Sequence, residues 1–66
     1  MPIYKNFENL LLKTSMKVSE VAEKTKISPS TFSDWKTGKS FPKVDKLQTI
    51  AKFFNVTIEY FLKNDE

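Results

Sequence analysis

The 66-residue sequence contains no cysteine, no histidine and no arginine, and it has only one glycine. The first two absences exclude disulfide bonds and the usual zinc sites. A chain this short must then fold by packing alone, and its 39% hydrophobic residues, with six Phe and one Trp, can supply a small core. Eleven lysines carry all the positive side-chain charge. Lysine binds phosphate as a point charge but lacks the planar fork that pairs with guanine.

Long apolar stretches are also missing from the sequence. None approaches the ~20 residues that span a bilayer, and polar residues interrupt the early apolar ones where a signal peptide would need an unbroken core. We therefore expect a soluble, cytoplasmic protein that has no membrane partner. The net charge of +3 suits a polyanionic partner, although the solubility of a small domain explains it equally well.

Apolar residues recur at helical spacing, and no useful stretch alternates with the period of a β-strand. We therefore predict an all-α fold of five helices. The predicted helices are about ten residues after Pro2, residues 17–25, residues 28–37, residues 43–54 ended by Asn55, and a last short helix capped by Thr57. No internal linker or repeat divides the chain, so residues 1–66 are predicted to form one domain. The polar tail, residues 63–66, is either a true C-terminus or the start of a linker.

Residues 18–38 are the most informative segment, because they predict two short helices joined by a tight turn. Ser28 suits the N-cap of the second helix, Pro29 its first position and Gly38 a left-handed residue at its end. Apolar residues give each helix one stripe, and the two stripes would face each other. The stripes consist of Val18, Val21, Ala22, Ile27, Phe32 and Trp35. The remaining polar face of the second helix fits a DNA major groove.

Several residues match one protein family at fixed offsets. Ala22 stands at the small position where the two helices cross, residues 35–39 carry the pattern W-x-x-G-K, and Pro42 follows as the downstream proline. Residues 56–62 are similar to a closing G-V-S-x-x-x-L-L pattern. On these matches, residues 16–62 resemble the Cro/repressor-type (XRE) helix-turn-helix family. The resemblance implies a compact, lambda-repressor-like DNA-binding domain with its helix-turn-helix at residues 17–37.

Two positions depart from the family pattern. Lys26 stands in the turn where the family often has glycine, and a left-handed non-glycine residue costs about 1 kcal/mol. Val18 stands where the family often has a glutamine that holds a phosphate. That contact would pass to the backbone amides at the start of the helix.

The resemblance also assigns roles to exposed residues of the third helix and its surroundings. Candidates for contact with bases are Pro29, Ser30, Ser33 and Asp34. Candidates for contact with phosphates are Lys17, Thr31, Lys36, Lys39, Ser40 and Lys43. Ser and Thr pair with several bases, whereas Asp34 can accept from cytosine N4. The alternative is that these are ordinary solvent-exposed side chains, with Ser30 and Thr31 only supporting the start of the helix.

Trp35 and the aromatic residues near the C-terminus can each be interpreted either as core residues or as contact residues. Trp35 could stack on a base, but it falls on the apolar stripe with Phe32 and is predicted to pack in the core. Four aromatics between residues 53 and 61 exceed what one small core requires, so either a monomer buries them all or some of them serve a dimer interface. The family commonly dimerises through its fourth and fifth helices. The dimer-interface candidates are Phe53, Tyr60 and Leu62.

The resemblance implies a homodimeric, nucleoid-associated transcription regulator, expected to be a repressor, of a phage, a mobile element or the chromosome. Two third helices would enter successive major grooves of double-stranded DNA, about 34 Å apart on a palindromic operator. An enzyme is not expected, because the sequence lacks His, Cys, a phosphate-binding glycine loop and an obvious pair of carboxylates. No cofactor, metal or small-molecule ligand is expected either. The alternative function is a helical protein-interaction module or antitoxin-type partner with weak or no specific DNA binding, which the absence of Arg, Gln and Asn from the recognition face favours.

Overall fold

The computed structural model describes residues 3–63, which form five α-helices and no β-strand. The helices are α1 (Ile3–Thr14), α2 (Val18–Thr25), α3 (Pro29–Thr37), α4 (Val44–Phe54) and α5 (Ile58–Leu62). The predicted all-α class and the predicted number of helices are therefore confirmed for this part of the chain. Pro2 and residues 64–66 of the predicted tail lie outside the described residues, and the single domain over 1–66 stays a prediction.

Several helix ends and one cap differ from the predicted ones, and α3 and α4 each begin one residue later than predicted. α1 continues through Thr14, where the sequence predicts a polar break, and the Thr14 hydroxyl donates to a carbonyl one turn earlier at 2.8 Å. Ser15, with a φ of 57°, follows the end of α1. α2 begins at Val18, one residue later than predicted, with Lys17 as its N-cap. Thr57 holds the N-cap position of α5, but its side chain makes no capping hydrogen bond, so its predicted capping role is wrong.

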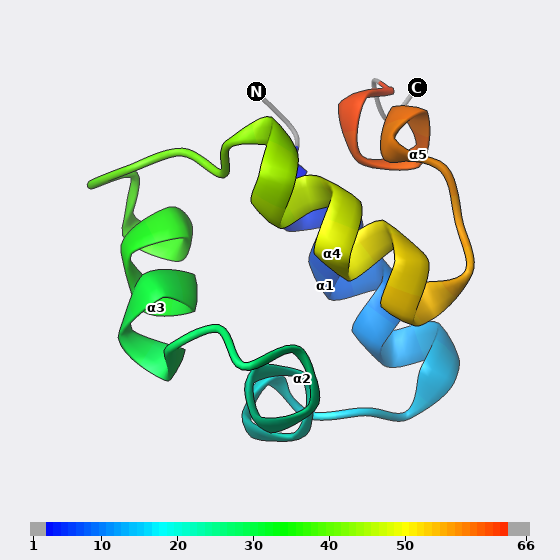
Figure 1. Ribbon diagram of the computed structural model, residues 1–66, viewed down its shortest axis with the longest axis horizontal. Coiled ribbons are helices and arrows are strands. Elements are labelled where there is room, and N and C mark those ends of the chain that lie inside the picture. The colour runs from blue at the N-terminus through cyan, green and yellow to red at the C-terminus, as the bar shows by residue number, and fades with distance from the viewer. Residues whose placement is uncertain (1–2, 64–66) are drawn as a thin grey trace.

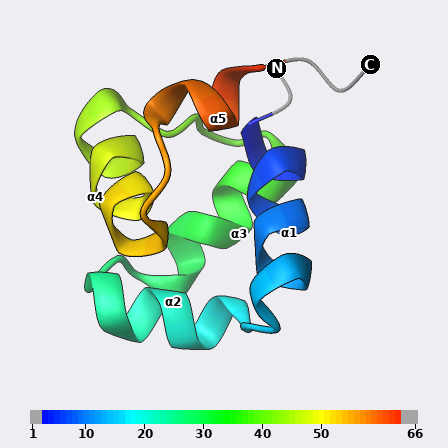
Figure 2. The ribbon, with the colours of Figure 1, turned by 90° about the vertical axis from the view of Figure 1, so that its right-hand side faces the viewer.

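The helices form two packed pairs, and α4 connects the pairs (Figure 1). α1 packs against α5, α2 packs against α3, and α4 contacts both α2 and α5. In Figure 2, α5 lies near the N-terminal end of α1, at the opposite end of the molecule from α2. Figure 1 shows α3 at one edge of the molecule, with the other helices on one side of it only. The other side of α3 is therefore open to a partner.

Aromatic side chains form the centre of the core. The Phe7 ring of α1 stacks on the Phe32 ring of α3 with centroids 5.3 Å apart, and Phe32 meets Trp35 edge-on at 5.0 Å. Phe32 is 1% exposed and Trp35 is 8% exposed. The predicted core role of Trp35 is therefore confirmed, and its ring is not presented to a nucleic-acid base.

Of the six apolar residues predicted to form the stripes of residues 18–38, all but Val18 are buried. Val21, Ala22 and Ile27 are buried between α2 and the rest of the core, whereas Val18 is only half-buried. In α4, helical spacing predicts that Val44 shares one apolar side with Leu47, Ile50 and Ala51, but Val44 is 65% exposed, so its expected burial is wrong. Val44 is the first residue of α4, and helical side chains lean toward the N-terminal end of their helix, which at this position lies beyond the core.

A single buried polar side chain connects α1 with the end of α5. Asn6 is 4% exposed, and its amide donates to the carbonyls of Phe61 and Lys63, both at 2.9 Å. Carbonyls at a helix C-terminus have no partner inside the helix, so the Asn6 amide satisfies groups that would otherwise lack one. Asn6 is therefore a structural residue, although in the sequence it only interrupts the apolar pattern.

Candidate nucleic-acid interface

Both ends of α3 are fixed by local hydrogen bonds. The Ser28 hydroxyl accepts from the Ser30 N–H at 3.3 Å, and Pro29 occupies the first turn, as the sequence predicts. At the other end Gly38 adopts a left-handed φ of 83°, and the Asp34 carbonyl accepts from the Lys39 N–H at 2.9 Å. The predicted capping roles of Ser28 and Gly38 are confirmed. α3 is thus held at its two ends without using most of its outward polar side chains.

In the turn between α2 and α3, Lys26 adopts the left-handed conformation that is expected at a position where the family often has glycine. Lys26 has a φ of 61° and a ψ of 28°, which places a non-glycine residue in the left-handed region. The next residue, Ile27, is 5% exposed and packs in the core. The burial of Ile27 holds the turn in place and offsets the conformational cost at Lys26.

The predicted base-contacting residues differ in how free they are to contact a base. Pro29, Ser30 and Ser33 are exposed, and Asp34 is half-buried. The hydroxyls of Ser30 and Ser28 lie 2.8 Å apart and share a hydrogen bond, so Ser30 takes part in the cap of α3. This contact favours the supporting role for Ser30 that the sequence leaves open. Among the four base-contact candidates, Ser33 and Asp34 have polar side chains that make no hydrogen bond to another described residue and so remain available.

The predicted phosphate-contacting residues are exposed, with one exception. The exposed ones are Lys17, Lys36, Lys39, Ser40 and Lys43. Thr31 is half-buried beside the Trp35 ring, and both residues line a groove on the outer surface. The start of α2 is less suited to phosphate than expected, because the Glu20 carboxylate already accepts from the Lys17 N–H at 3.0 Å. A carboxylate at a helix N-terminus occupies the position that a phosphate would take.

Positive charge is concentrated in the segment from the end of α3 to the first turn of α4. Residues 36–46 contain four lysines against one aspartate, a net +3, which equals the net charge of the whole chain. The remaining residues therefore sum to zero charge. Lys46, exposed on the first turn of α4, belongs to this cluster and is absent from the predicted set. Counting charge by segment, rather than over the whole chain, would have identified Lys46 as part of the cluster.

The three dimer-interface candidates have different surroundings. Leu62 is 41% exposed, whereas Phe53 and Tyr60 are half-buried. The Phe53 ring meets Phe54 edge-on at 4.9 Å, and the Lys63 and Lys13 ammonium groups lie 4.9 and 5.8 Å from the centre of the Tyr60 ring. Of the four aromatics between 53 and 61, only Phe61 is fully buried. The core thus leaves parts of the other rings at the surface of α4 and α5.

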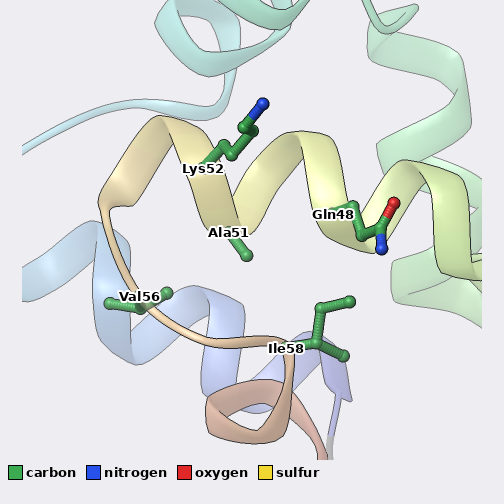
Figure 3. A pocket seen from close by; sticks show the side chains of 5 residues that line it. All are labelled: Gln48, Ala51, Lys52, Val56 and Ile58. Carbon is green, nitrogen blue, oxygen red and sulfur yellow. The ribbon is translucent and has the colours of Figure 1, made fainter.

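A shallow groove of about 350 Å³ separates α4 from the segment that leads into α5 (Figure 3). Ala51 and Ile58 point into it from its two sides. The longer polar side chains at its rim, Gln48 and Lys52, point in different directions in Figure 3. Binding sites for small molecules usually combine an apolar pocket with converging polar groups, and the polar groups of this groove do not converge.

Comparisons with known proteins agree with this geometry. Residues 6–63 match the family model of the Cro/C1-type HTH DNA-binding domain. The chain is also similar to the HTH-type transcriptional activator BcrR of Enterococcus faecalis, with 38% identity over 47 residues. That alignment covers 71% of this chain and 23% of BcrR, so the chain spans about a quarter of the length of this relative. No solved structure matches the chain.

The family is one of DNA-binding domains. Among residues 3–63 no helix is long and apolar enough to cross a membrane. The match begins within α1 and extends through the end of α5. The chain therefore belongs to the Cro/C1-type helix-turn-helix DNA-binding domain family.

Proposed function

We propose that this chain binds double-stranded DNA sequence-specifically and regulates transcription, with α3 in the major groove. One observation carries the proposal: the exposed polar face of α3 adjoins the segment, residues 36–46, that holds the entire net charge of the chain. Lysines of that segment would contact phosphates and provide affinity that falls with salt, while α3 contacts base edges and provides specificity. The burial of Phe32 and Trp35 behind α3 keeps its outer face in a fixed position.

The surroundings of each side chain indicate whether it would contact a base or a phosphate. Ser33 and Asp34 would contact bases, because their side chains are not engaged within the domain. Ser30 would act chiefly through the cap of α3, and Pro29 would approach bases only through apolar contact. Lys39 is exposed beyond the end of α3 and would contact a phosphate regardless of sequence.

A homodimer fits this mode of binding. Phe53, Tyr60 and Leu62 each leave apolar surface on α4 or α5, which a second copy would cover. A two-fold dimer would present two copies of α3 to successive major grooves, about 34 Å apart, on an inverted repeat. The partners proposed are thus double-stranded DNA and a second copy of this chain.

Repression is the proposed sense of regulation. A DNA-binding domain that occupies a promoter blocks access to it without any further contact, whereas activation needs an additional surface for the transcription machinery. BcrR is a transcriptional activator and is about four times as long as the segment it shares with this chain. A reporter gene placed downstream of the selected binding site should therefore lose expression when this chain is produced, and a gain would reverse the assignment.

Selection from a random DNA duplex library tests the central proposal. We expect an inverted-repeat consensus, and recovery of no consensus would favour the helical interaction module. Asp34→Asn should change the preferred base at one position of each half-site, because an amide both donates and accepts where a carboxylate only accepts. Lys39→Ala should leave the consensus unchanged and lower the slope of log affinity against log salt by about 0.9 for each copy of the chain in the complex.

A matched control separates these effects from general damage to the domain. Ser19→Ala removes an exposed hydroxyl from α2 and serves as the match for Ser33→Ala on α3. Ser33→Ala should relax base preference and Ser19→Ala should not. An identical consensus from the wild type and from both α3 variants would show that α3 does not contact the bases.

A further inference from the structure

The outer side of α1 carries Leu12, the most exposed large apolar side chain among residues 3–63. Leu12 is 80% exposed and stands where an amphipathic helix usually has a polar residue. A shallow groove of about 450 Å³ lies beside it, lined by Lys5, Glu8, Asn9, Leu11, Leu12 and Met16. These residues follow the spacing of one helix face, so the groove runs along α1.

The turn that ends α1 fixes one end of this groove. Ser15 has a left-handed φ of 57°, and the Met16 N–H donates to the Leu11 carbonyl at 3.0 Å. This is the hydrogen bond of a Schellman motif, in which an apolar contact between the two bonded residues is common. Met16 is half-buried and packs against the core. The face therefore combines a projecting leucine with a groove whose apolar end is held by the backbone.

A projection and a groove on one face suit a second copy of the same face. In a two-fold interface the same patch lies on both sides, so each copy places its projection in the groove of the other. Charge allows this pairing, because Lys5 and Glu8 are the charged residues of the groove and their charges cancel. Residues 36–46, with a net charge of +3, would instead repel their own copy.

This face is separate from the surface of the proposed dimer. The dimer-interface candidates lie on α4 and α5, and none of them lines the groove on α1. In the view of Figure 2, α1 and α4 lie at opposite edges of the molecule, with α3 between them. A molecule with α3 on DNA therefore has α4 on one flank and α1 on the other. The α1 face is left for contact between one dimer and the next.

We propose that the outer face of α1 binds the same face of a second copy, with each Leu12 in the groove of the other, and that this contact links dimers at adjacent DNA sites. The docking itself does not require DNA, whereas its effect on DNA binding rests on the proposed function. A contact centred on one leucine is weak between free molecules. On one duplex, a high effective concentration strengthens it, so binding to adjacent sites is cooperative.

Duplexes with one or two copies of the selected site test this contact. The spacing of the two sites is varied over one helical turn, about 10.5 base pairs, so that the dimers meet in every relative rotation. At the best spacing, the second wild-type dimer should bind about tenfold more tightly than the first. Leu12→Ala and Leu12→Asp should remove this cooperativity and leave the affinity for a single site unchanged. The aspartate would place a carboxylate in an apolar groove beside Glu8 of the second copy.

Leu12→Met is the matched control, because it keeps an apolar side chain of similar volume at the same position. It should bind both duplexes like the wild type. Gel-shift titration resolves duplexes with one and with two bound dimers, and circular dichroism checks that each variant is folded.

The possible results separate this inference from the proposed function. If the wild type binds two sites without cooperativity at every spacing, or if Leu12→Asp is as cooperative as the wild type, only the inference fails. If the wild type binds no duplex, the proposed function fails, and sedimentation equilibrium without DNA decides the inference. Growth beyond the dimer with concentration, abolished in Leu12→Asp, would support the docking. Equal masses of the two proteins at every concentration would overturn it and assign the face to a different partner.

Discussion

The two packed helix pairs are stabilised in different ways. Between α1 and α5, the buried Asn6 amide donates to two carbonyls across more than fifty residues of sequence. Between α2 and α3, contact is apolar, and the side-chain hydrogen bonds of these helices are local ones at the helix ends and within single turns. Long-range polar contacts therefore occur between α1 and α5, which we call the scaffold, while the polar groups of α3 face outward.

This difference explains how so small a domain can both fold and bind. A polar side chain that makes a tertiary hydrogen bond is no longer available to a ligand. The buried side chains of α3 are Phe32 and Trp35, and they hold the middle of the helix, so the polar side chains on its outer face are not needed for packing. The cost of this arrangement is that the position of α3 depends on a few aromatic contacts.

Loss of an aromatic contact should have the largest effect on stability. Phe32→Ala should lower the free energy of unfolding by about 3–5 kcal/mol, because it removes a ring that contacts both Phe7 and Trp35. Urea denaturation followed by circular dichroism measures the change. Phe41→Ala is the control, and its exposed ring should contribute less than about 0.5 kcal/mol. Equal effects of the two variants would contradict the proposed anchoring of α3.

Removal of the scaffold's buried amide should have an intermediate effect. Asn6→Ala should cost about 2 kcal/mol, since two carbonyls at the end of α5 lose their donor in a buried site. Asn9→Ala on the same helix is the control and should change stability by less than about 0.5 kcal/mol. DNA affinity of the folded Asn6→Ala protein should match that of the wild type, and a large loss would show that the two pairs are not independent.

Substitutions at the two left-handed residues beside α3, Lys26 and Gly38, should have the smallest effects on stability, and the two effects should have opposite signs. Gly38→Ala should cost about 1 kcal/mol, and the loss is purely conformational because an added Cβ would meet nothing within 4 Å. Lys26→Gly should stabilise the domain by about 0.5 kcal/mol, since relief of the left-handed lysine exceeds the added flexibility of the unfolded chain. Thermal unfolding compares both variants, and a shift in the same direction would refute the conformational explanation.

Sequence reasoning succeeded where the determining interactions are local. Ser28, Gly38 and Asn55 occupy the predicted helix-end positions, because capping depends on residues within one turn. The stripe residues Phe32 and Trp35 are buried because helical periodicity fixes which side they share. Family resemblance then assigned the fold and the candidate face of α3, and the family match confirms the assignment of the fold.

Sequence reasoning failed where the outcome depends on distant parts of the chain. Asn6 interrupts an apolar pattern, and only the packing of α5 against α1 gives its amide two partners. Val44 matches the α4 stripe, yet the first turn of that helix lies beyond the core. The exposure of Phe41 is equally invisible in the sequence, since the connector could have folded back over the core.

The sequence by itself determined the five helices, the caps of α3 and the apolar side of the helix-turn-helix pair, because these follow from spacing and from contacts within a turn. Tertiary structure decided which polar groups are left for a partner: Asn6 is engaged between α1 and α5, while Ser33, Asp34 and the lysines of residues 36–46 remain exposed or half-exposed. Availability is decided at this level because a side chain's freedom depends on what surrounds it in three dimensions. Local sequence does not specify those neighbours.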